Sequence, residues 1–136
     1  MRFAALAAWL LAAAVGAYLL VIGPAREGPF RQATKVTRYP AVVVLGHPLC
    51  ALAGLALWTG YLGTGRAVYA WSAFGVLVAV VMLGVTLFTR WLVGGGGRHA
   101  RGAEHAFPTV AVPLHGLAAA ATFVLVLLTA LDGDRP

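Results

Sequence analysis

Four long stretches of the chain contain no charged residue and are predominantly apolar. They cover residues 3–22, 41–65, 67–89 and 107–131. A helix needs about 20 apolar residues to cross the hydrocarbon core of a bilayer, and each stretch is at least that long. Backbone groups in lipid must hydrogen-bond within their own segment, and the alternation of a barrel strand is absent from these stretches. The pattern therefore predicts an all-α protein, a bundle of four transmembrane helices. The expected helices cover about residues 3–22, 41–63, 68–91 and 109–131.

Composition supports a membrane protein rather than a soluble one. The chain is 61% hydrophobic and 10% charged, whereas soluble domains carry about 25% charged residues. We expect one membrane domain over residues 1–136, with the lipid bilayer as its surroundings. The first apolar stretch is longer than the 7–15 residues of a usual signal-peptide core, so it is expected to remain as a helix.

Basic residues lie mainly in two of the segments that connect the expected helices. The first connection holds Arg26, Arg31, Lys35 and Arg38, the third holds Arg90, Arg98 and Arg101, and Arg2, Arg66 and Arg135 lie on the opposite side. Cytoplasmic loops carry an excess of Lys and Arg. This bias predicts a bacterial cytoplasmic membrane protein with both termini outside. Because orientation accounts for the net charge of +6, no nucleic-acid partner is expected.

The two halves of the chain repeat each other. A shift of 68 residues superposes His47 on His115 and Gly16 on Gly84, together with several apolar pairs that are common in such segments. The repeat predicts two helical hairpins, residues 1–68 and 69–136. Their common orientation indicates a pseudo-two-fold axis along the membrane normal, as in parallel repeats.

The repeat places two imidazoles at one depth in the membrane. At 1.5 Å per helical residue, the histidines lie about 9–10 Å inside the cytoplasmic boundary, and the two glycines lie about 9 Å from it. An ionisable residue within the membrane is a functional hypothesis by default. Two imidazoles entering from opposite sides are typical axial ligands of a haem iron. We therefore predict one haem b between His47 and His115, with Gly16 and Gly84 leaving room for the macrocycle.

Further residues are candidates for contacts with this haem. Gly46 and Gly116 each adjoin a histidine, and a missing side chain there permits close approach of a porphyrin. Arg38 and Arg90 are the cations nearest the haem along the helices, and arginine suits the carboxylates of the propionates. The positive-inside bias alone would also account for these arginines.

The arrangement of His47, His115, Gly16 and Gly84 resembles the four-helix membrane b-type cytochromes, including the cytochrome b core bundle and cytochrome b561-like proteins. In the core bundle, the second and fourth helices carry the haem-ligating histidines, and the first and third carry glycines against the haem. The resemblance implies a b-type haem held across the bundle. One departure is that each ligand helix here has one histidine instead of two, which argues against a second haem. The FTRWL and PLHGL segments are also similar to small four-span membrane proteins of bacteria.

The predicted function is electron transfer at the cytoplasmic face, with a quinone or a partner protein. Haem sensing, storage or delivery would give the same pattern. One alternative is a non-catalytic membrane subunit or assembly factor of a larger complex, or a homo-oligomer, whose histidines make packing contacts. Another is a copper or small-solute carrier, because imidazole with the sulfurs of Cys50 and Met82 suits Cu(I). No acid–base pair or nucleophile set is visible, so an electron carrier is favoured over an enzyme. The roles of His99 and His105 stay open.

Overall fold

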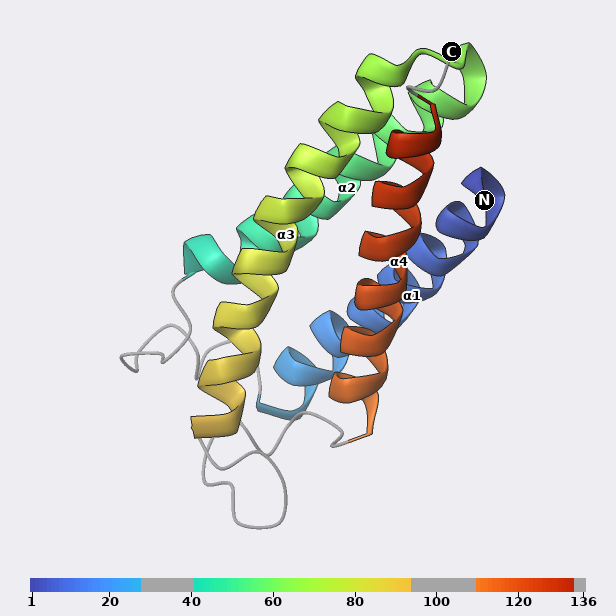
Figure 1. The fold of residues 1–136 in the computed structure, drawn as a ribbon. Coiled ribbons are helices and arrows are strands. Elements are labelled where there is room, and N and C mark those ends of the chain that lie inside the picture. Colours follow the sequence, from blue (N-terminus) through green and yellow to red (C-terminus); the bar gives the residue numbers. More distant parts are fainter. Residues whose placement is uncertain (28–40, 94–109, 134–136) are drawn as a thin grey trace.

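The computed structural model describes residues 1–27, 41–93 and 110–133. Within these ranges the chain forms four helices: α1 (Arg2–Glu27), α2 (Ala41–Thr64), α3 (Ala67–Val93) and α4 (Ala111–Asp132) (Figure 1). Each contains a segment long and apolar enough to cross a membrane, namely Arg2–Val21, Val42–Thr64, Ala67–Val93 and Ala111–Asp132. The predicted fold class, an all-α bundle of four membrane-spanning helices, is confirmed.

Two helices continue beyond the limits expected from the apolar stretches. α1 runs on to Glu27 and α3 to Val93, whereas α4 begins at Ala111. A helix satisfies its own backbone groups and does not need apolar side chains once it leaves the hydrocarbon region. The length of a charge-free stretch therefore predicts where a helix crosses the membrane better than it predicts where the helix begins and ends.

The helices run up and down between two ends of the bundle. We call the end where α1 and α3 begin the terminal end, and the end where α2 and α4 begin the loop end (Figure 1). At the terminal end α2 and α3 are joined by a tight turn. Gly65 has a φ of 69° and its N–H donates to the Tyr61 carbonyl at 2.8 Å. A left-handed backbone of this kind suits glycine, which has no Cβ to clash.

The bundle consists of two closely packed helix pairs. α2 packs mainly along α3, and α4 packs mainly along α1, whereas α1 and α2 contact each other least of these neighbours. We call residues 1–68 and 69–136 the two 68-residue units of the repeat. The main packing partner of every helix therefore belongs to the other unit. Figure 1 shows α3 and α4 spreading apart toward the loop end.

The core lies almost wholly between the level of the histidines and the terminal end. Its buried side chains are Ala5, Trp9, Ala12, Trp58, Tyr61, Ala70, Ala73, Leu77, Val80, Ala118, Thr122, Val126, Thr129 and Ala130. On the loop side of the histidines, Trp91 alone is buried among residues 13–21, 42–46, 81–93 and 110–114. One half of the bundle is thus densely packed, and the other half leaves its described side chains, except that of Trp91, half-buried or exposed.

Burial follows the 68-residue repeat. The buried pairs related by the shift are Ala5 and Ala73, Trp9 and Leu77, Ala12 and Val80, Gly54 and Thr122, Trp58 and Val126, and Tyr61 and Thr129. In the first unit, the large side chain of Trp9 lies against a residue without a side chain, Gly54. The Trp9 indole packs on Gly54, where an added Cβ would be 2.9 Å from the indole Cζ2. At the equivalent positions of the second unit lie Leu77 and Thr122, whose side chains are closer to each other in size.

Candidate functional site

The structure brings the two membrane histidines together between the helix pairs. His47 projects from α2 and His115 from α4, and both are half-buried. Their ring centres are 6.0 Å apart, and the ring planes make an angle of 74°. The shared depth predicted from the repeat therefore becomes direct proximity, since one histidine comes from each pair.

Both imidazoles are anchored through the same ring nitrogen. His47 Nδ1 donates to the Val80 carbonyl of α3 at 3.0 Å, and His115 Nδ1 donates to the Ala12 carbonyl of α1 at 2.9 Å. A carbonyl oxygen only accepts hydrogen bonds, so each Nδ1 carries the proton. In a neutral imidazole the other nitrogen, Nε2, then has a free lone pair. Within the described residues neither Nε2 has a hydrogen-bond partner. This is the tautomer that a metal ligand needs.

The two anchors are equivalent under the repeat and they cross between its units. Ala12 shifted by 68 residues is Val80, just as His47 shifted by 68 is His115. The histidine of the first unit is hydrogen-bonded to the second unit, and the histidine of the second unit is hydrogen-bonded to the first. The two hydrogen bonds of the site are thus related by the same 68-residue shift as the histidines.

Gly16 and Gly84 lie directly against the imidazoles. A Cβ added at Gly16 would be 3.0 Å from His115 Cε1, and one added at Gly84 would be 3.1 Å from His47 Cε1. The space above each glycine therefore holds the histidine ring in this structure. This contact was not foreseen from the sequence, which assigned the space to a macrocycle.

The glycines adjacent to the histidines in the chain do not face the ring pair. A Cβ at Gly46 would make an ordinary contact of 3.8 Å with Leu83, and one at Gly116 would meet nothing within 4 Å. Gly116 is exposed on the outside of the bundle. Neither position is closed to a side chain by the packing of the protein itself.

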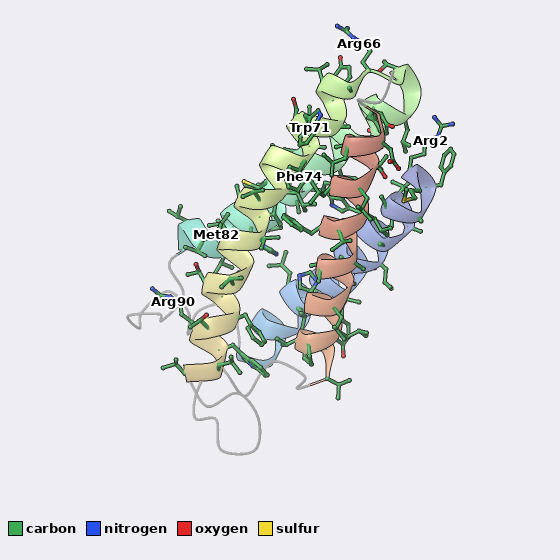
Figure 2. The ribbon with its side chains drawn as sticks, in the orientation of Figure 1. Arg2, Arg66, Trp71, Phe74, Met82 and Arg90 are labelled. Atoms are coloured by element: carbon green, nitrogen blue, oxygen red, sulfur yellow. The ribbon has the colours of Figure 1, made fainter. Side chains whose placement is uncertain are left out.

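Among the predicted propionate partners, Arg90 is described and Arg38 lies outside the described residues. Arg90 is exposed in the last turn of α3, toward the loop end (Figure 2). It is six residues beyond Gly84, which is about 9 Å along the helix axis. His99 and His105 also lie outside the described residues.

The two sulfur atoms of the copper alternative lie in different surroundings. Met82 is 63% exposed, so its thioether lies on the surface of α3 that would face lipid (Figure 2). Cys50 is half-buried and packs against the core on the terminal side of His47. Within the part of the chain that the structure describes, no group of three or more His, Cys, Asp or Glu residues is placed to hold a metal ion.

Sequence reasoning missed the two backbone acceptors, the carbonyls of Ala12 and Val80. Each acceptor precedes a predicted glycine by four residues, so carbonyl and glycine lie one turn apart on the same helix face. The 68-residue shift already relates the two positions, but a backbone acceptor has no side-chain signature. Comparison with family models, curated proteins and solved structures finds no match to this chain.

Proposed function

We propose that the protein is a membrane-embedded b-type haem protein, with His47 and His115 as the axial ligands of one haem. The observation that carries this proposal is the pair of Nδ1-anchored imidazoles, one from each helix pair, whose Nε2 atoms have no hydrogen-bond partner among the described residues. Haem iron is commonly held by histidine, and its potential is set by the hydrogen bonds and burial of the ligands.

The separation of the rings fits two ligands of one metal ion. A metal–imidazole nitrogen bond is about 2 Å long, which puts the centres of two opposed rings about 6 Å apart. The observed separation of the ring centres is 6.0 Å. This separation of the ring centres is compatible with two histidines that share one iron.

The loose half of the bundle supports a bulky apolar group at this level. On the loop side of the histidines, Trp91 is the single buried residue of the described ranges. The described side chains of this half therefore do not by themselves form the close-packed interior that is usual in proteins. The two helix pairs touch least where α1 meets α2, so a flat group on that side of the bundle would disturb few contacts between the pairs.

The residues around the haem have defined roles in this proposal. The Val80 and Ala12 carbonyls hold the rings in the ligand tautomer and increase their basicity. Haem supplies a one-electron couple when bound. The basic residues between the helices at the loop end would attract the propionates, and Arg38 and Arg90 are the nearest of them to the histidines along the sequence. We infer that the loop end faces the cytoplasm of a bacterial cell and that both termini lie outside.

Electron exchange would occur at the loop end, with a membrane quinone or a partner protein. The terminal half of the bundle is packed with apolar and hydroxyl side chains, and its described residues include no histidine. One haem near one face therefore serves a donor and an acceptor on the same side of the membrane.

The alternative is a membrane subunit or assembly factor in which the histidines join helices and bind nothing. The hydrogen bonds from His47 to α3 and from His115 to α1 favour this reading equally. The two functions differ in one property, because a purely structural histidine gives no bound chromophore.

The deciding experiment is an absorption spectrum of the detergent-purified protein, oxidised and then reduced with dithionite. Expression with ample haem should give a Soret band that shifts on reduction and narrow α and β bands. His47→Ala and His115→Ala should each abolish the low-spin spectrum, whereas Gly116→Ala, beside a ligand but facing open space, should retain it. A colourless wild-type protein would overturn the proposal and favour a structural role.

A further inference from the structure

Gly16 and Gly84 occupy positions that no larger residue can take without moving a histidine. The distances from an added Cβ to the imidazole Cε1 are 3.0 Å at Gly16 and 3.1 Å at Gly84, and those to Nδ1 are 3.4 Å and 3.5 Å. Real Cβ atoms rarely approach another group so closely. The nearest atoms belong to a ring whose Nδ1 is hydrogen-bonded, so the ring must turn or shift by a few tenths of an ångström to admit the Cβ.

Each imidazole is therefore held at two points of one neighbouring helix. His115 donates to the Ala12 carbonyl and rests on Gly16, one turn further along α1. His47 donates to the Val80 carbonyl and rests on Gly84, one turn further along α3. A hydrogen bond at one ring atom fixes a point, and the contact at Cε1 restricts rotation of the ring about it.

We infer that Gly16 and Gly84 are positioning residues, each of which fixes the imidazole plane of the histidine in the other 68-residue unit. The two planes are held at 74° to each other in this way. The effect of these glycines on haem ligands rests on the proposed haem function. Their effect on the orientation of the two rings applies to the haem-free protein as well.

The mutual orientation of two axial imidazoles has a spectroscopic signature. Near-perpendicular planes leave the iron d orbitals that interact with the ligands almost equal in energy, which raises the largest g value of the low-spin ferric signal. Near-parallel planes split these orbitals and lower that g value. A side chain that turns one ring must therefore move the signal, even when both ligands stay bound.

The test in the haem-free protein uses magnetic resonance of isotope-labelled histidine. We expect a crossed pattern: Gly16→Ala shifts the ring signals of His115 and leaves those of His47, and Gly84→Ala does the opposite. Gly46→Ala and Gly116→Ala are matched controls, because each adjoins a histidine in sequence and neither added Cβ would come closer than 3.8 Å to a side chain other than those of its chain neighbours. They should leave the ring signals in place apart from small local changes.

The wild-type protein provides a second measurement that needs no variant to fold. Nuclear Overhauser contacts should join the Cε1 proton of His115 to the Cα protons of Gly16, and that of His47 to those of Gly84. Missing contacts, an uncrossed pattern, or equal shifts in the two control variants would overturn the inference. In haem-loaded protein, Gly16→Ala and Gly84→Ala should retain haem and change the largest g value from that of the wild type. If the crossed pattern appears in a protein that binds no haem, the glycines position the histidine rings and only the proposed haem function is rejected.

Discussion

His47 and His115 lie with their ring centres 6.0 Å apart, yet each is hydrogen-bonded to a helix of the other's 68-residue unit. The two units are therefore interlocked at the level where their ionisable groups meet. Loss of either histidine removes one contact between α2 and α3 or between α1 and α4, and it leaves the other contact intact.

The first prediction concerns the stability of the haem-free protein. His47→Leu and His115→Leu should each lower the free energy of unfolding by about 0.6 kcal/mol and by no more than about 2 kcal/mol, the range of interhelical hydrogen bonds in membranes. Unfolding in mixed detergent and dodecyl sulfate, followed by circular dichroism, measures the change. Leu52→Ala, at a residue 61% exposed, is the control and should change stability little. A variant that cannot be purified in folded form would show that the histidines hold the fold itself.

A second prediction concerns the indole packed on Gly54. Gly54→Ala should destabilise the protein by about 1–3 kcal/mol, because overpacking a filled site forces side chains from their preferred positions. The added Cβ would come within 2.9 Å of the Trp9 ring. The second change Trp9→Leu, which copies the residue at the equivalent position 77, should restore much of the loss. Gly63→Ala meets nothing within 4 Å and should be neutral or stabilising. Equal effects at the two glycines would contradict the packing argument.

The turn between α2 and α3 gives a third prediction. Gly65→Ala should cost about 1–2 kcal/mol of stability, the penalty for a side chain in the left-handed region. Space is not the cause, because nothing lies within 4 Å of the added Cβ and φ is 69°. Gly65→Asn should cost less than Gly65→Ala, since asparagine adopts this conformation more readily. Thermal unfolding of the two variants separates backbone strain from crowding.

The orientation in the membrane can be tested at two arginines. Arg66 lies at the terminal end and Arg90 toward the loop end (Figure 2). In a Cys50→Ala background, Arg66→Cys should react with an impermeant maleimide in intact cells. Arg90→Cys should react only after the cells are opened, because the positive-inside rule places the loop end in the cytoplasm. The reverse pattern of labelling would invert the topology and move electron exchange to the outer face.

Some features of this protein follow from the sequence and others do not. The four helices were predictable, because 20 apolar residues without charge leave few other structures in lipid. The common depth of His47 and His115 followed from the repeat. The contact of Trp9 with Gly54 was not predictable, since helices that are apolar on all sides do not show which face turns inward. In lipid, an inward leucine and an outward one look the same in the sequence.

The crossing of the histidine contacts was also beyond the sequence. It depends on α2 packing along α3 and on α4 packing along α1, whereas the repeat alone is compatible with each hairpin closing on itself. The long connections after α1 and α3 impose no neighbour on either helix. Packing of α2 along α3 decides that His47 reaches the Val80 carbonyl, and packing of α4 along α1 decides that His115 reaches the Ala12 carbonyl.

The uneven burial along the bundle has a consequence for how the protein is made. Nearly all buried side chains lie between the histidines and the terminal end, so this half has the contacts to assemble as soon as the four segments are in the bilayer. The other half, toward the loop end where α2 and α4 begin, is less tightly packed. A prosthetic group could thus be installed after membrane integration, by entry between two preformed helix pairs, and the chain would not have to unfold to receive it.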